Sequence, residues 1–209
     1  MNTAVDNILI VEDLEQIREL LKVTLTYQGY EVVTARNGEE ALEAVAEETP
    51  ALILTDLLMP KMDGYALIYR LRRNADTRQI PVIVLSATYV SAADKDFALS
   101  LGAVRFLEKP VDTADLLLAI GETLADGEQP QKPELDDLMF YTGYQARLER
   151  KLQQKTQQFS RTERLLKTLP DSQKPVFQTL LEEARQQKNE LMSELEDIAD
   201  DLGKLKRTA

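Results

Sequence analysis

The chain has 209 residues, 44% of them hydrophobic, and a formal net charge of −11, so it has enough apolar residues for a packed core and a length suited to one or one and a half domains. It contains no cysteine, which excludes disulfides and thiolate chemistry and agrees with a cytoplasmic location. The longest apolar runs have strand length, and the start lacks a basic segment followed by an apolar one. We therefore expect neither a membrane span nor a signal peptide.

The negative charge belongs to the first part of the chain. Residues 1–127 hold 11 Lys and Arg against 21 Asp and Glu, whereas residues 128–209 hold 14 against 15. Two prolines and a glycine interrupt the chain around residues 127–133, which is typical of a linker. We predict a first domain over residues 1–126, a linker over residues 127–133 and a second domain over residues 134–209.

The first domain alternates short apolar runs with amphipathic helical patterns. The expected strands are residues 7–11, 30–35, 51–55, 81–85 and 104–108. Helical spacing follows each of them, over about residues 14–28, from a cap at Asn37 to before Pro50, and over about residues 64–73, 91–101 and 112–125. Five consecutive βα units with right-handed crossovers predict a doubly wound parallel sheet.

Acidic residues follow two of these strands directly. Asp56 ends the uncharged strand 51–55, and Glu12 and Asp13 end the strand 7–11. The carboxyl ends of parallel strands meet at one edge of the sheet, where α/β proteins bind ligands. Three carboxylates in one crevice repel one another unless a cation neutralises them, and oxygen ligands without Cys or His favour Mg²⁺.

The same edge receives a hydroxyl and an ammonium group. Ser86 follows the strand 81–85, and Lys109 with Pro110 follows the strand 104–108. Glu12, Asp13, Asp56, Ser86 and Lys109-Pro110, with Leu-Met-Pro-Lys-Met-Asp-Gly after the aspartate, resemble the CheY-like receiver domain of bacterial two-component response regulators. The resemblance covers about residues 7–125.

This resemblance implies a flavodoxin-like sheet with strand order 2-1-3-4-5 and a function in signal transduction. Asp56 would accept a phosphoryl group from a sensor histidine kinase or a histidine phosphotransfer protein. Asp13, Asp56 and the backbone carbonyl of Leu58 would bind Mg²⁺, and Glu12 would act on it through a water molecule or as an acid just outside the ligands. Ser86 and Lys109 would hold phosphoryl oxygens.

The resemblance also implies a switch and a cis bond. Phosphorylation would draw Ser86 inward, and the ring of Phe106 would move into the space that Ser86 leaves. Family members often carry Tyr or Phe at this position, and Phe has no hydroxyl to bond in its outward state. The peptide bond between Lys109 and Pro110 would be cis.

Simpler readings and another enzyme class compete with these roles. Asp56 could be a helix cap or turn residue, Glu12 and Asp13 could be first-turn acids favoured by a helix dipole, and Phe106 could be a fixed core residue. Phosphatases resembling haloacid dehalogenases also use a Mg²⁺-bound aspartate after a strand, but they place a second Asp two residues on, where this chain has Leu58. We therefore expect a phosphoacceptor with slow autodephosphorylation and not an enzyme that turns over phosphate esters.

The second domain contains two long helical patterns, which the segment from Leu169 to Pro175 separates. In each pattern mostly apolar residues alternate at spacings of three and four, as in a coiled-coil seam, with polar interruptions at Gln145, Lys155, Thr162 and Lys188. The first seam comprises positions 138, 141, 145, 148, 152, 155, 159, 162, 166 and 169, and the second comprises positions 177, 181, 184, 188, 191, 195, 198, 202 and 205. We predict an antiparallel coiled-coil hairpin.

The charges of the two helices favour this antiparallel pairing, but they do not indicate what the second domain does. Residues 147–167 carry seven basic and two acidic groups, whereas residues 182–201 carry eight acidic and two basic groups. Met139, Phe140, Tyr144, Leu165, Val176 and Leu180 lie partly off the seams. We expect this surface to form a homodimer or to bind a partner protein, unless the hairpin only packs on its own receiver.

Two further functions of the second domain compete with protein binding. A nucleic-acid-binding helical domain, as in a transcription regulator or antiterminator, is the alternative, although the acidic helix would neutralise the basic one. Glutamines at 153, 154, 157, 158, 186 and 187 could form a phosphatase surface, but glutamine on an exposed helix is usually only solvated. A further domain could also follow the coiled coil.

Overall fold

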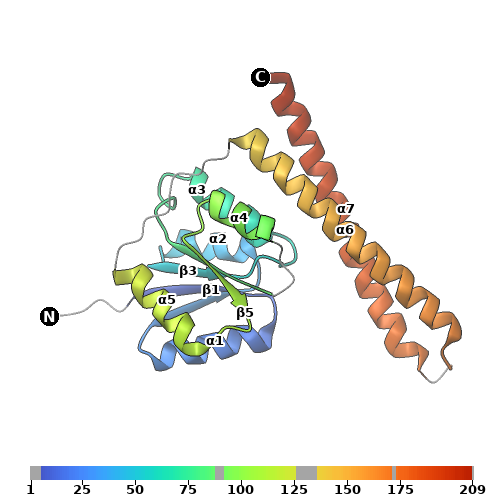
Figure 1. The fold of residues 1–209 in the computed structure, drawn as a ribbon, viewed down its shortest axis with the longest axis horizontal. Coiled ribbons are helices and arrows are strands. Elements are labelled where there is room, and N and C mark those ends of the chain that lie inside the picture. The colour runs from blue at the N-terminus through green and yellow to red at the C-terminus, as the bar shows by residue number, and fades with distance from the viewer. Residues whose placement is uncertain (1–5, 88–91, 126–135, 171–172, 209) are drawn as a thin grey trace. The chain divides into compact units, whose positions relative to one another are not determined.

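The first part of the chain folds around one parallel sheet. The computed structural model describes residues 6–87, 92–125, 136–170 and 173–208. In these residues the strands are ordered β2-β1-β3-β4-β5 and all neighbouring pairs are parallel, as predicted (Figure 1). They are β1 (Asn7–Val11), β2 (Glu31–Ala35), β3 (Leu52–Thr55), β4 (Val82–Ala87) and β5 (Arg105–Lys109).

Helices cover both faces of the sheet. Helices α1 and α5 lie on one face, and α2, α3 and α4 lie on the other (Figure 1). They are α1 (Glu15–Tyr27), α2 (Gly38–Glu47), α3 (Gly64–Arg73), α4 (Ala92–Ser100) and α5 (Thr113–Ala125). The predicted cap at Asn37 is confirmed, because its Oδ1 accepts from the backbone N–H groups of Glu39 (3.0 Å) and Glu40 (3.1 Å).

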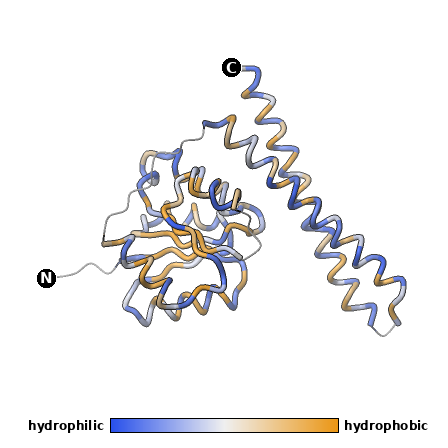
Figure 2. Tube along the Cα trace, viewed as in Figure 1, coloured by the Kyte–Doolittle hydropathy of each residue, from blue (hydrophilic) through white to orange (hydrophobic). Residues whose placement is uncertain are grey.

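The apolar strand residues form the core, as Figure 2 shows. All four residues of β3 are buried, because helices pack on both of its faces. On the face of α1 and α5, Ile8, Leu54 and Ile83 pack with Leu25 and Ile120. This rigid sheet fixes the ends of β1 and β3 next to each other, since Val11 pairs with Thr55.

A buried arginine holds two loops at the far end of α3. Arg72 is 6% exposed, and its guanidinium donates to the carbonyl of Gly102 from Nε (3.2 Å) and Nη2 (2.8 Å). Its Nη1 donates to the carbonyls of Arg78 (3.1 Å) and Ile80 (2.9 Å). Burial lowers the pKa of Arg72 to about 10. Arg72 therefore satisfies the carbonyls of the α3–β4 and α4–β5 connections, which would otherwise be buried without donors.

The second part of the chain is a hairpin of two long helices. Helix α6 (Asp137–Thr168) and helix α7 (Lys174–Thr208) contact each other along their length and run antiparallel, as predicted. The chain divides into two compact units, Met1–Leu135 and Asp136–Ala209, and the predicted linker at 127–133 lies outside the described residues. In the described ranges, no helix combines the length and the apolar character that crossing a membrane requires.

The seam of α7 agrees with the prediction, but the first third of the α6 seam does not. Leu138 is 37% exposed, whereas Phe140 and Tyr144 are 2% and 3% exposed, so the expectation that these two aromatic residues lie off the seam was wrong. Their rings stack at 5.3 Å, and burying two aromatic side chains removes more apolar surface from water than burying Leu138 would. From Leu148 onward the predicted positions are buried or half-buried.

Glu194 places a carboxylate beside this seam. It accepts a hydrogen bond from the hydroxyl of Tyr144 (2.5 Å). Burial raises the pKa of Glu194, while Tyr144 and the charge of Lys151 oppose this rise and Asp197 adds to it. A raised pKa in the folded state contributes stability that is complete below the unfolded pKa and is lost as the pH rises through the folded pKa. The charged carboxylate therefore destabilises the hairpin at neutral pH.

A Glu194→Gln variant tests this sign. Glutamine keeps an acceptor for Tyr144 and removes the charge. We therefore expect the free energy of unfolding, measured by thermal unfolding, to rise by up to about 1 kcal/mol near pH 7 and not to rise near pH 4. The expected rise is small because water reaches part of the carboxylate and screens its charge. Glu196→Gln, on the exposed face, is the matched control and should change little at either pH. An equal gain at both pH values would contradict this electrostatic account.

Candidate functional site

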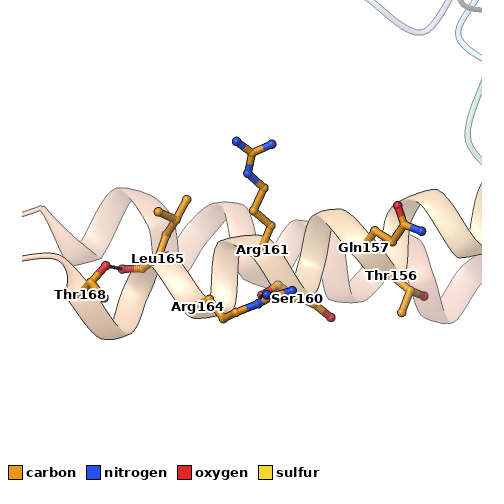
Figure 3. Close-up of a pocket in the computed structure, with 7 residues that line it drawn as sticks. All are labelled: Thr156, Gln157, Ser160, Arg161, Arg164, Leu165 and Thr168. Atoms are coloured by element: carbon orange, nitrogen blue, oxygen red, sulfur yellow. Dashed lines mark hydrogen bonds between the residues drawn. The ribbon is translucent and has the colours of Figure 1, made fainter.

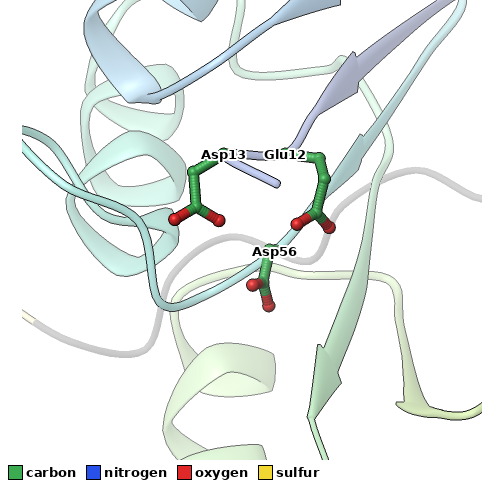
Figure 4. A group of neighbouring side chains, drawn as sticks. All are labelled: Glu12, Asp13 and Asp56. Atoms are coloured by element: carbon green, nitrogen blue, oxygen red, sulfur yellow. The ribbon is translucent and has the colours of Figure 1, made fainter. Parts of the chain in front are cut away.

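Three carboxylates meet at the ends of β1 and β3. Glu12 and Asp13 follow β1 and Asp56 follows β3, and Figure 4 shows the side chains of Glu12 and Asp13 on either side of Asp56. One carboxylate oxygen from each residue lies within 4.8 Å of the other two. Backbone hydrogen bonds fix the strand ends, because Asp56 N–H donates to the carbonyl of Val11 (2.9 Å). The sheet edge therefore brings together the acids that the sequence places there.

Lys109 reaches this cluster from the end of β5. Its Nζ lies 2.5 Å from Glu12 Oε2 and 3.6 Å from Asp56 Oδ2. The side chains of Lys109, Asp56 and Glu12 are 16%, 12% and 2% exposed, so the ammonium group balances negative charge in a site that water reaches only in part. The peptide bond from Lys109 to Pro110 is cis, as the resemblance implied.

Ser86 lies within β4 and not after it. The strand continues to Ala87, which pairs with Lys109 of β5, so the hydroxyl and the ammonium group stand on neighbouring strands. Ser86 is fully buried, and its Oγ has no hydrogen-bond partner among the described residues. A buried hydroxyl without a partner is destabilising, which makes Ser86 a candidate donor to a ligand.

The loop after Asp56 also borders the site. Leu57 N–H donates to Asp56 Oδ1 (2.8 Å), and the side chain of Leu58 is 45% exposed. Gly64, at the start of α3, donates its N–H to the carbonyl of Leu57 (3.0 Å). A Cβ at Gly64 would overlap the carbonyl oxygen of Asp56, so only glycine lets α3 begin so close to the carboxylate.

Burial and neighbouring charge act in opposite directions on the carboxylates. Burial raises the pKa of Asp56, while Lys109 and the Leu57 N–H lower it and Asp13 raises it. Burial also raises the pKa of Glu12, against the hydrogen bond and charge of Lys109. One ammonium group thus faces three carboxylates, and the site retains an excess of negative charge that a cation would neutralise.

The donor set fits Mg²⁺. All three side chains offer hard oxygen atoms, which Mg²⁺ prefers over the nitrogen and sulfur ligands typical of zinc. Their spacing within 4.8 Å permits one ion to contact more than one of them. Glu12, Asp13 and Asp56 are the residues that could hold it.

Phe106 and Arg18 lie on β5 and α1, the strand that carries Lys109 and the helix that follows Glu12 and Asp13. Phe106 in β5 is half-buried, and the Nζ of Lys95 lies 5.9 Å from the centre of its ring. Arg18, in the first turns of α1, was not predicted: its Nη1 donates to the carbonyls of Glu12 (2.7 Å) and Asp13 (3.2 Å). A basic residue near a helix N-terminus interacts unfavourably with the helix dipole. This unfavourable placement is the sequence feature that could have indicated a compensating contact for Arg18.

Comparisons with known proteins agree on one family. Residues 8–121 match the family described as the response regulator receiver domain. A curated relative is the "Probable transcriptional regulator ycf27" of Pyropia yezoensis, which is 39% identical over 124 residues, 59% of this chain and 49% of the relative. The chain spans about half the length of the curated relatives listed first among its matches.

Solved structures resemble the same region. The signal receiver domain of a signal transduction histidine kinase from Syntrophus aciditrophicus is 37% identical, with a TM-score of 0.56, and the match covers 63% of this chain and 98% of that one. The chemotaxis protein CheY4 of Vibrio cholerae is 31% identical, with a TM-score of 0.54, over 57% and 98% of the two chains. The carboxylate edge, the sheet order and these matches show that the chain belongs to the response regulator receiver domain family.

Proposed function

We propose that the protein is a two-component response regulator that accepts a phosphoryl group on Asp56 in a Mg²⁺-dependent reaction. The observation that carries this proposal is the convergence of Glu12, Asp13, Asp56 and Lys109. Ser86, on the strand next to that of Lys109, adds a buried hydroxyl that has no hydrogen-bond partner among the described residues. The donor would be a sensor histidine kinase or a histidine phosphotransfer protein, since receiver domains imply such partners in general. The absence of cysteine agrees with a cytoplasmic location.

The transfer follows from the position of each side chain. A carboxylate oxygen of Asp56 attacks phosphorus, an O–P bond forms, and the P–N bond to the donor histidine breaks, with the electron pair and a proton ending on the imidazole. Lys109 Nζ, 3.6 Å from Asp56 Oδ2, can pair with an oxygen of the transferred group. When bound, Mg²⁺ would neutralise the charge of the carboxylates and the phosphoryl oxygens. Asp13, Asp56 and the carbonyl of Leu58 would be its ligands, and Glu12 would act through a water molecule or as an acid just outside them.

A conformational switch would follow phosphorylation. The Oγ of Ser86 is buried without a partner among the described residues, and a phosphoryl oxygen on Asp56 would supply one. Movement of Ser86 toward Asp56 would leave space that the ring of Phe106 could enter. In support of this, Val84 and Ser86 of β4 pair with Phe106 and Glu108 of β5, so Ser86 and Phe106 lie diagonally across two neighbouring strands.

The hairpin of α6 and α7 is the proposed output. We expect it to act by binding a second copy or another protein, because Met139, Leu165, Val176 and Leu180 remain between 44% and 66% exposed. The ycf27 relative is named a transcriptional regulator, but the similarity covers the receiver alone. A nucleic-acid-binding output is less well supported, since the basic helix α6 pairs with the acidic helix α7.

A small phosphodonor such as acetyl phosphate distinguishes this function from a phosphatase. We expect the donor to label the protein with at most one phosphate per chain, only with Mg²⁺ present, and the label to decay slowly. Intact-mass spectrometry measures the stoichiometry, and release of inorganic phosphate from a chromogenic ester measures turnover. Multiple turnover of the ester, or labelling that is unaffected by chelation of Mg²⁺, would contradict the proposal.

A further inference from the structure

One flank of the hairpin carries an exposed apolar patch near its loop. In an α-helix, residues seven apart lie on the same side, so Leu165 shares a side of α6 with Gln158, Lys151 and Tyr144. Leu180 likewise shares a side of α7 with Gln187 and Glu194. The charge of Lys151 acts on Glu194, so these two sides form the same flank of the hairpin.

The members of this patch lie at the same level along the hairpin. Lys155 Nζ donates to Gln187 (2.8 Å), and further toward the loop Leu165 comes within about one helical turn of Leu180 and Val176. These three side chains are 44%, 48% and 66% exposed. We call Leu165, Val176 and Leu180 the loop-end patch.

Opposite charges border the loop-end patch. Arg161 lies one turn before Leu165 on α6, and Glu183 lies one turn after Leu180 on α7. Figure 3 shows the side chains of Arg161 and Leu165 projecting from the same side of α6, where both line a shallow hollow. Arg185 and Lys188 of α7 lie over the ring of Phe159 of α6. Arg161 is two residues closer to the loop than Phe159, and Glu183 is two residues closer to the loop than Arg185, so Arg161 and Glu183 lie at about the same height along the hairpin.

Building on the dimer of the proposed function, we propose that two hairpins join by this flank as a parallel four-helix bundle, with α6 of each copy on α7 of the other and both loops at the same end. A two-fold axis parallel to the helices places each residue of one copy at the same height along the bundle as the same residue of the second copy. Leu165 then meets Leu180 of the second copy, and Arg161 meets Glu183 of the second copy. Each contact occurs twice.

Charge complementarity selects the second copy in this orientation as the occupant. The flank combines a basic helix, with seven basic and two acidic groups over residues 147–167, and an acidic helix, with eight acidic and two basic groups over residues 182–201. In the parallel bundle every neighbouring pair joins a basic helix to an acidic one. An axis perpendicular to the helices would instead place α6 on α6 and α7 on α7, so that like charges would face each other.

A charge swap in the full-length protein tests the contact. By sedimentation over a concentration series, with and without beryllofluoride, we expect Arg161→Glu to weaken dimerisation about tenfold and the double variant Arg161→Glu/Glu183→Arg to restore it to within about twofold. Leu165→Glu with Leu180→Glu should weaken it about a hundredfold. Met192→Glu is the matched control, because Met192 is 43% exposed and directly follows the seam residue Leu191, which puts it on the flank opposite Glu194.

Cysteine cross-linking tests the orientation, because the chain has no native cysteine. We expect Gln173→Cys, next to the loop, to form a disulfide between two copies of itself. A dimer in which Gln173→Cys cross-links only to a Lys204→Cys chain, or in which the charge swap fails to rescue, would overturn the parallel bundle and leave dimerisation standing. A protein that stays monomeric with and without phosphorylation, or a monomer that binds mixed DNA through α6, would overturn both the parallel bundle and dimerisation. Phosphate labelling at Asp56 would remain a separate test of the receiver.

Discussion

An Asp56→Asn variant is expected to lose all phosphate labelling and to remain folded. The amide oxygen of asparagine can still accept the hydrogen bond from Leu57 N–H, which Asp56 Oδ1 accepts at 2.8 Å. Its nitrogen cannot replace the carboxylate oxygen as a nucleophile toward phosphorus. Intact-mass spectrometry after incubation with acetyl phosphate and Mg²⁺ measures the loss directly.

The same variant has a second expected effect that separates chemistry from unfolding. Burial raises the pKa of Asp56, so the charged carboxylate destabilises the folded state at neutral pH and contributes favourably only when protonated. Removing the charge should therefore leave the melting temperature without Mg²⁺ unchanged or higher. Asp76→Asn, at an exposed position after α3, is the matched control and should label normally. Full labelling of Asp56→Asn would show that another residue is the phosphoacceptor.

A Gly64→Ala variant is expected to be both less stable and poorly labelled. The added Cβ would overlap the Asp56 carbonyl oxygen and lie 2.9 Å from the Cα of Leu57. These are backbone atoms that cannot rotate away, so the start of α3 or the segment carrying Asp56 must shift. Overpacking of this kind destabilises by about 1–3 kcal/mol, and thermal unfolding by circular dichroism measures it.

Gly121→Ala is the matched control for Gly64→Ala. Gly121 lies inside α5, and a Cβ there would meet no other atom within 4 Å. Because alanine restricts the unfolded chain and favours a helix, this change should stabilise by about 0.5–1 kcal/mol. Equal effects of the two substitutions would show that the close approach of Gly64 to Asp56 has no energetic consequence.

The sheet and the carboxylate edge could be predicted because each rests on local sequence. Uncharged runs such as residues 51–55 mark strands that helices cover on both faces, and parallel strands end at a common edge. The sequence alone therefore predicts that Asp56 and Asp13 lie together. The ends of β4 and β5 were less predictable, because pairing of Ala87 with Lys109 extends both strands past the predicted ends at residues 85 and 108.

Long-range contacts of charged side chains could not be predicted. Arg72 reaches the carbonyl of Gly102, 30 residues away, and no local pattern indicates which carbonyl a long side chain will satisfy. The pair of Lys109 with Glu12 spans 97 residues and was likewise missed, although both residues were assigned to the site.

The two helices of the hairpin show why one seam was predicted better than the other. In α7 the apolar residues Leu181, Ala184, Leu191, Leu195, Ile198 and Leu202 fall on one stripe and Met192 lies outside it, so one phase is clearly favoured. At the start of α6 two phases compete, one through Leu138 and one through Phe140 and Tyr144. The aromatic pair is buried because its rings stack on each other and Tyr144 finds a hydrogen-bond acceptor in Glu194.

A crystal structure of the protein with Mg²⁺ and beryllofluoride would examine the reactive pocket at atomic level. The mimic should bond to an oxygen of Asp56, with the ion on Asp13 and the Leu58 carbonyl, and with Lys109 and Ser86 each contacting a fluorine. Attachment of the mimic to Glu12 or Asp13, or a Lys109 that points away from it, would contradict the claim that these side chains together make Asp56 the phosphoryl acceptor.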